Sequence, residues 1–391
     1  MRARSSSMRN HRAAAATALG TMMFATLTGC GNSDPDAEAP PAQDTLEAAV
    51  RPVITEQMEE MGIPGLVAIV QSPDRGNYEI AAGVSNIDTG EPVEMSDHFR
   101  IGSITKTFTA TVVLQLAQEG KFGLDDPLEK YFPDVDTNGA TIRQALNMTS
   151  GIPTYTTDAF LNALADDPQR VWTPDELLAT IEGVPADFAP GEGWEYSNTN
   201  YVLLGMLAER FGDAPLRTLI QDRVFTPSQM NGCSLPIATD ATIPGPFSYG
   251  YQYGTKWDDP SPPAPTPELV DVTNFNPSWG FGAGEAICTA ADLAIWAKVL
   301  VDGDLLEPEM QAQRLDFITT GPLPYGLGIG DLNGLVGHNG HISGFQTQTA
   351  VRQADGTVIV VLTNITQAPD LQLPASMISA LISGAIPASP N

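Results

Sequence analysis

The spacing of hydrophobic residues changes along the chain, and these changes predict where helices and strands lie. Over 45–61, apolar residues recur at helical spacing, and the segment ends at Gly-Ile-Pro-Gly, 62–65. The apolar runs 66–71 and 78–82 predict two strands joined by a Pro-Asp-Arg-Gly turn. Late in the chain, 348–352 and 357–363 predict a β-hairpin around an Ala-Asp-Gly turn, and 374–383 predicts a last helix.

The middle of the chain has mainly helical periodicity. An apolar stripe follows Ser103, and further helices are expected over 141–148, 174–182, 199–211, 215–222 and 289–302. The proline-rich segment 258–267 predicts a surface loop. Strands near both ends with helices between them predict an α/β fold: a sheet unit from 44–105 and 320–391, with a mainly helical domain, 106–319, inserted into it. A ligand-binding cleft is expected between the two.

The first residues resemble an export signal. Residues 1–29 contain four arginines and no acidic residue, and an apolar run over 13–27 leads to Leu-Thr-Gly-Cys. This pattern resembles that of a bacterial lipoprotein signal peptide with lipid attached at Cys30, and the polar, proline-rich segment 30–43 would be a flexible tether. The alternative is an ordinary cleaved signal with a chance cysteine. We therefore expect an exported protein, anchored to the cell envelope only through a lipid.

Composition narrows the possible functions. The 391 residues are 42% hydrophobic, enough for a large core, and 19 basic against 47 acidic residues give a net charge of −28. Such acidity argues against binding nucleic acid, which needs a basic surface. The chain has four histidines and lacks metal-binding patterns such as C-x-x-C, so no metal or other cofactor is expected. Cys233 and Cys288 could form a disulfide in an exported protein, but the sequence leaves this open.

The sequence Ser-Ile-Thr-Lys at 103–106 is the first candidate for chemistry, at the point where a loop enters a helix. Residues at i and i+3 share one helix face, so Lys106 would lie beside the Ser103 hydroxyl. Burial favours a neutral lysine, which could activate the serine as a nucleophile. The chain has only five lysines, and Lys106 is the one that follows a serine by three positions. The alternative is a helix-capping serine with a surface lysine.

Two further short motifs could complete a site. In Tyr-Ser-Asn, 196–198, Tyr196 near a lysine could have a lowered phenol pKa and transfer protons, while Asn198 could hold the lysine and bind a substrate carbonyl. In His-Asn-Gly, 338–340, expected on an edge strand, Gly340 would allow a substrate backbone to approach. The backbone N–H groups of His341 and Ser103 could then bind an oxyanion. The alternatives are an asparagine helix cap and a polar turn.

Together, these three motifs resemble the serine β-lactamase and DD-peptidase superfamily, in the branch whose second motif has a tyrosine. The resemblance extends from about Thr45 to Asn364 and includes Ala-Pro-Gly at 189–191 and Tyr-Gly-Leu-Gly at 325–328. It implies an antiparallel sheet flanked by helices, catalysis by Ser103, Lys106 and Tyr196, and no cofactor. It also implies that residues of the second and third motifs contact the substrate: Asn198, His338, Asn339, Gly340 and His341. Two aromatics, Phe160 and Trp279, would flank the substrate, and the alternative for these two is core packing.

The chain departs from secreted DD-carboxypeptidases, which it resembles most. Those enzymes grip a substrate carboxylate with an arginine just after Tyr-Gly-Leu-Gly, where this chain has Gly330 and then Asp331. Asn339 and His341 stand where threonines are expected, and His341 could replace the arginine only if protonated. Met148 stands where many relatives have a histidine before Thr-Ser-Gly, which we expect to affect structure only.

The resulting prediction is an exported serine hydrolase that forms an acyl-enzyme at Ser103. D-alanyl-D-alanine carboxypeptidase-like cleavage of peptidoglycan peptides is the leading expectation. An esterase or β-lactam hydrolase using the same residues, acting on another small acyl substrate, is the first alternative. A catalytically idle lipoprotein that binds peptidoglycan is the second.

Overall fold

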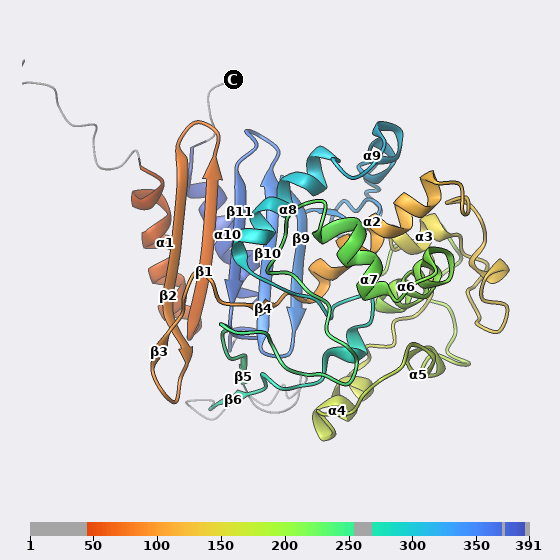
Figure 1. The fold of residues 1–391 in the computed structure, drawn as a ribbon, viewed down its shortest axis with the longest axis horizontal. Coiled ribbons are helices and arrows are strands. Elements are labelled where there is room, and N and C mark those ends of the chain that lie inside the picture. Colours follow the sequence, from red (N-terminus) through yellow and green to blue (C-terminus); the bar gives the residue numbers. More distant parts are fainter. Residues whose placement is uncertain (1–44, 254–267, 370–371, 388–391) are drawn as a thin grey trace, which may run out of the picture. The chain divides into compact units, whose positions relative to one another are not determined.

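The main structural element is a seven-stranded antiparallel sheet that takes strands from both ends of the chain (Figure 1). In this computed structural model, residues 45–253, 268–369 and 372–387 are described. The predicted signal peptide, Cys30, the tether and the loop 258–267 lie outside these residues. In spatial order the strands are β3 (Glu91–Pro92), β2 (Gly76–Asn86), β1 (Gly65–Ser72), β11 (Val358–Thr363), β10 (Phe345–Arg352), β9 (Leu335–Ile342) and β8 (Gly330–Asp331).

The sheet confirms the predicted mixed α/β fold, because the strands from the two ends are central neighbours. β1 pairs with β11 over six residue pairs, from Leu66 with Thr363 to Gln71 with Val358. Both strands are buried almost throughout, since each face of the sheet is covered by helices. The division into a sheet domain and an inserted helical domain stays a prediction.

Helices cover both faces of the sheet. The face formed by alternate residues such as Ala350 packs against α1 (Leu46–Met61) and α10 (Pro374–Ala385). The opposite face packs against α8 (Ala290–Asp302), with Thr349 Oγ1 donating to the Leu293 carbonyl at 3.0 Å. Thr45 caps the first turn of α1, and Gly62 ends it in the left-handed conformation, as the sequence predicts.

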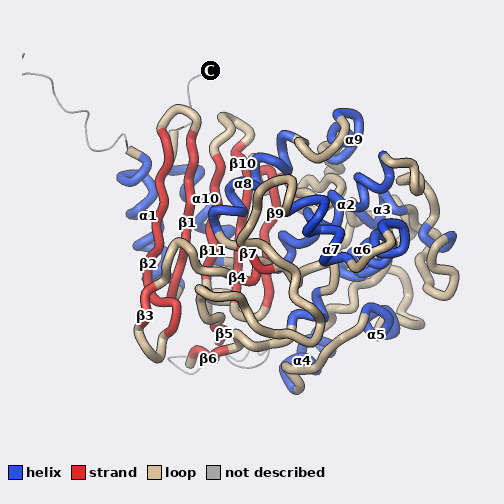
Figure 2. Tube along the Cα trace, viewed as in Figure 1, coloured by secondary structure: helices blue, strands red, loops and turns tan. Residues whose placement is uncertain are grey.

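The remaining helices lie beside the β9 side of the sheet, at the right in Figure 2. They are α2 (Thr105–Gln118), α3 (Ile142–Leu146), α4 (Asp158–Asp166), α5 (Pro174–Ala179), α6 (Asn198–Gly212), α7 (Leu216–Ile220) and α9 (Pro308–Arg314). The short pairs are β4 (Phe99–Arg100) with β7 (Ile287–Cys288), and β5 (Tyr251–Tyr253) with β6 (Leu269–Asp271). The sequence analysis did not predict α4 or α9. No helix in the described part of the chain is long and apolar enough to cross a bilayer.

A disulfide joins Cys233 to Cys288, which answers the question the sequence left open. Cys288 lies on β7 and pairs with Phe99, four residues before Ser103. The bridge therefore ties a distant loop to β7, which pairs with the strand that leads into the predicted nucleophile.

Candidate active site

Ser103 lies on a short 3₁₀ turn, Gly102–Ile104, which directly precedes α2 and packs against β9. Gly102 has φ of 53°, a left-handed conformation that glycine adopts without strain. Ser103 remains partly exposed, whereas the residues on either side of it are buried. The turn thus presents one hydroxyl to solvent from an otherwise buried segment.

Lys106 is fully buried one turn later, as the i and i+3 spacing predicts. Its Nζ lies 2.9 Å from Ser103 Oγ and donates to the Ala283 carbonyl oxygen at 2.7 Å. Burial without a carboxylate partner lowers the pKa of Lys106 well below its ordinary value. A neutral amine that donates one hydrogen to Ala283 keeps its lone pair, which can accept the Ser103 proton.

The carbonyl of Ala283 is the functional group that the sequence analysis missed. It lies in a turn that is fastened to α2 at two other points: Thr109 Oγ1 donates to the Gly282 carbonyl at 2.8 Å, and the Ala286 N–H donates to Thr105 Oγ1 at 3.1 Å. The alternating glycines of the Gly-Phe-Gly-Ala-Gly stretch, 280–284, are the sequence signal for this tight turn.

Tyr196 lies beside the serine–lysine pair, just before α6. The Lys106 Nζ is 4.9 Å from the centre of the Tyr196 ring, and the phenol is hydrogen-bonded with Ser103. Burial raises the pKa of Tyr196, and the Ser103 bond offsets only part of this effect. The direction is opposite to the lowered pKa expected from the sequence. The phenol therefore keeps its proton and is suited to act as a donor.

The hydrogen bonds of Asn198 go to residues other than Lys106. Its side-chain amide donates to Thr156 Oγ1 at 3.0 Å, and its backbone N–H donates to Thr154 Oγ1 at 3.3 Å. In this structure the Ala283 carbonyl, and not Asn198, is the hydrogen-bond partner that holds the lysine beside Ser103. Asn198 instead fixes the start of α6, and with it Tyr196 two residues earlier.

His338 is buried on the face of β9 that points toward Tyr196, with the two ring centres 6.4 Å apart. Its Nδ1 lies 2.5 Å from the Asn339 carbonyl oxygen, so Nδ1 carries the hydrogen. Nε2 then accepts from the Tyr325 hydroxyl at 2.9 Å. Burial, with a further effect from Lys106, lowers the pKa of His338 to about 3. The imidazole is therefore neutral, with both nitrogens occupied.

Asn339 and His341 alternate with His338 along β9, so their side chains point to the opposite face of the sheet. Asn339 donates to Ser376 Oγ at 3.4 Å on α10, and His341 is paired with Gln346, whose side chain also contacts α10. Burial lowers the pKa of His341 to about 4. His341 therefore cannot take the place of the missing arginine, because its imidazole is neutral and its side chain points to the opposite face of the sheet.

The backbone of His341 can still serve the site. The hairpin turn at 343–344 makes Ile342 and Phe345 the last pair of β9 and β10, so the N–H of the preceding His341 points away from β10. A Cβ on Gly102 would lie 2.6 Å from this nitrogen, which shows how closely the Ser103 turn approaches it. A Cβ on Gly340 would overlap the Ile101 carbonyl oxygen. The glycine thus makes room for the protein's own turn, and its approach to substrate stays a prediction.

Phe160 and Trp279 lie in a buried aromatic cluster. Their rings are 6.3 Å apart, and Phe160 also packs against Tyr155 and Trp172 at 5.2 and 4.8 Å. Both side chains are less than 10% exposed, at 6% and 7%. This environment favours the core-packing alternative for the two residues.

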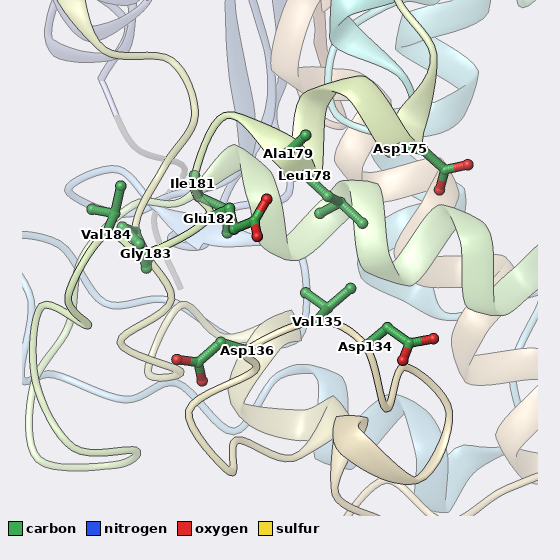
Figure 3. A pocket seen from close by; sticks show the side chains of 11 residues that line it. Asp134, Val135, Asp136, Asp175, Leu178, Ala179, Ile181, Glu182, Gly183 and Val184 are labelled. Carbon is green, nitrogen blue, oxygen red and sulfur yellow. The ribbon is translucent and has the colours of Figure 1, made fainter.

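Two hollows near this half of the molecule differ in character. A cavity of about 90 Å³ adjoins the site and is lined by Trp194, Tyr196, Leu323, Tyr325, Gly330, Leu332, Gly337, His338 and Asn339. A second hollow of about 330 Å³ lies between α5 and the 134–136 segment (Figure 3). Its rim carries the carboxylates of Asp134, Asp136, Asp175 and Glu182, and no predicted catalytic residue lines it.

A partly exposed serine and a buried lysine, set against the edge of an antiparallel sheet, define a hydrolase of the serine β-lactamase and penicillin-binding-protein superfamily. The chain belongs to the beta-lactamase family, whose model matches residues 50–381. A solved D-stereospecific amidohydrolase from Streptomyces sp. is 31% identical, with a TM-score of 0.73, and the match covers 88% of this chain and 98% of that one.

Curated relatives carry more than one type of name. Penicillin-binding protein 4* of Bacillus subtilis (strain 168) is 29% identical over 200 residues, which are 51% of this chain and 43% of that protein. Esterase EstB of Burkholderia gladioli is 29% identical over 219 residues, 53% of this chain and 56% of that protein. In both cases the alignment covers less than two thirds of the relative's length. The family is therefore shown, while the substrate is not.

Proposed function

We propose that the protein hydrolyses amide or ester bonds through an acyl-enzyme on Ser103. The observation that carries this proposal is the 2.9 Å contact between Ser103 Oγ and the buried Nζ of Lys106, whose pKa burial lowers. Ser103 Oγ attacks the substrate carbonyl carbon and gives its proton to neutral Lys106. The backbone N–H groups of Ser103 and His341 stabilise the oxyanion that forms.

Collapse of this intermediate breaks the bond to the leaving nitrogen or oxygen. Tyr196 gives its phenol proton to the leaving atom and is reprotonated by Lys106, which balances the proton taken from Ser103. A water molecule then attacks the acyl-enzyme carbonyl, and the same residues operate in reverse to release the acid and restore Ser103. Because the Lys106 and Tyr196 side chains are adjacent, they titrate as a coupled pair.

For the substrate, D-alanyl peptides of the cell wall are the first candidate. The names of the penicillin-binding and D-stereospecific amidohydrolase relatives support an amide next to a D-configured residue. An ester is the second candidate, supported by the name of the esterase relative. It is also favoured by the cavity beside Tyr196, because His338, the one basic residue among those that line it, is neutral.

Covalent labelling tests the proposal. A fluorophosphonate probe and a fluorescent penicillin should each label the wild-type protein, with the corresponding mass increase, and Ser103→Ala should remove the label. Ser343→Ala, in the turn after β9, is the control and should label normally. A folded wild-type protein that neither probe labels would instead favour the idle, peptidoglycan-binding alternative. Turnover of a D-Ala-D-Ala peptide, a short-chain ester and a cephalosporin, measured side by side, would then rank the substrates.

A further inference from the structure

The cavity of about 90 Å³ beside Tyr196 has a definite place in the proposed reaction. A proton donor must lie within hydrogen-bond reach of the atom that it protonates. Tyr196 forms part of the cavity wall, whereas Ser103 does not. We infer that this cavity binds the leaving group of the substrate and selects an uncharged, small and apolar one. The inference rests on the proposed function and narrows its substrate class. It favours an ester, or an amide with an uncharged leaving group, over a D-Ala-D-Ala peptide, whose leaving group carries a carboxylate.

The cavity wall is apolar and without charge. Leu323 and Leu332 contribute aliphatic surface, and Trp194 and Tyr325 contribute rings whose centres are 6.0 Å apart. His338 is the one residue of the lining set with a basic side chain. It is neutral, and its two nitrogens are occupied by Asn339 and Tyr325, so it has no N–H left to offer a carboxylate.

Among the residues that the structure describes, none that lines the cavity carries a positive charge. Lys106, 4.9 Å from the Tyr196 ring, is the nearby lysine, and its neutral form is the one needed for catalysis. Asp331 follows Gly330 directly and contributes negative charge at the same edge. A carboxylate leaving group would therefore lose its hydration without gaining a partner. A primary amide would carry a much smaller desolvation cost, and an alkyl group would carry none.

The volume limits the size of the group. A water molecule occupies about 30 Å³ in the liquid, and a dry apolar cavity of about 150 Å³ holds benzene. At about 90 Å³, the cavity matches a short alkyl chain better than an aromatic ring. Among esters of one acid, we expect propyl and isopropyl leaving groups to be preferred over phenyl-substituted ones.

The test uses two substrates that differ only in the charge of the leaving group: the ester of N-acetyl-D-alanine with D-lactate and the ester with D-lactamide. The wild-type kcat/KM should be at least about 100-fold higher for the neutral lactamide ester, because the buried carboxylate is unpaired. A ratio near one would overturn the inference. Labelling of Ser103 by the fluorophosphonate is measured in the same preparation. A ratio near one with intact labelling would overturn the inference and leave the proposed function standing. Absence of both labelling and turnover would refute the proposed function itself.

Gly330→Arg tests the missing charge directly. A Cβ at Gly330 would lie 3.5 Å from the Tyr325 ring, an ordinary contact, so a side chain can be accommodated. Gly330→Gln is the matched uncharged control. The arginine should form a charge-assisted pair with the lactate carboxylate. It should therefore lower the ratio of kcat/KM for the lactamide ester to that for the lactate ester at least about tenfold, and the glutamine should leave this ratio unchanged. Equal effects of the two variants would contradict the inference. If Gly330→Arg does not fold, Leu332→Arg and Leu332→Gln give the same comparison.

Discussion

Glu285 offers the sharpest test of the electrostatics behind the site. Its side chain is 7% exposed and accepts a hydrogen bond from the Gly282 N–H at 3.1 Å, within the turn that carries the Ala283 carbonyl. Burial, with a smaller contribution from Glu209, raises the pKa of Glu285 from 4.5 to about 7. Glu285→Gln replaces this carboxyl with an amide that has the same shape, can still accept the Gly282 hydrogen bond and cannot ionise.

The sign and size of the effect follow from proton linkage. Between pH 4.5 and 7, the unfolded chain loses the Glu285 proton while the folded protein keeps it, so the stability of the wild type falls as the pH rises through this window. The full loss is about 3 kcal/mol, because one pKa unit corresponds to about 1.4 kcal/mol. Glu285→Gln lacks this loss. We expect the stability of the variant relative to wild type to rise by about 3 kcal/mol between pH 4 and pH 8.

Urea unfolding followed by tryptophan fluorescence at pH 4, 6 and 8 measures the effect. Glu56→Gln, on the exposed face of α1, is the matched control for the substitution itself. If the Glu285→Gln difference did not change with pH, the buried carboxyl would not be protonated at neutral pH, and the reasoning would be refuted.

Three further changes test other parts of the structure. Tyr196→Phe removes the proton donor and should lower kcat/KM by about 100- to 10,000-fold, and a fall of less than threefold on several substrates would rule the donor role out. The Cys233–Cys288 disulfide closes a 55-residue separation, so replacing both cysteines with serine should cost about 4 kcal/mol in urea unfolding; an unchanged midpoint would contradict this. Gly340→Ala forces the new methyl group against Ile101 and should displace the nucleophile's turn, lowering kcat about 100-fold in a protein whose circular dichroism stays native; normal turnover would show that the turn tolerates the shift.

Local signals in the sequence predicted much of the fold. The first helix was predicted within a residue because Thr45 and Gly62 are a strong cap and stop. The hairpin of β10 and β11 followed from its turn and its apolar runs. The helix α9 has seven residues and lacks a side-chain cap, which accounts for its weak signal. The helix α4 has a Thr157 cap and apolar residues on one face, so its signal was present in the sequence and was overlooked.

The candidate site was predicted in its residues but not in its contacts. Spacing alone placed Lys106 beside Ser103, because both lie on one helical turn. The hydrogen-bond partner of the Asn198 side chain is Thr156, 42 residues away in the sequence, and no spacing rule reveals such a contact. The raised pKa of Tyr196 depends on burial by distant segments, which the sequence does not show.

The pairing of β1 with β11 has a consequence for the timing of biosynthesis. The Gly65 N–H donates to the Asn364 side chain across 299 residues, so the centre of the sheet cannot close until the chain has been made as far as residue 364. At about 5 to 20 residues per second, a ribosome needs about 15 to 60 seconds to cover that distance. The turn bearing Ser103 also waits for β9, against which it packs. Hydrolytic activity should therefore emerge only after β11 has been translated, and a nascent chain truncated before that strand should be inactive.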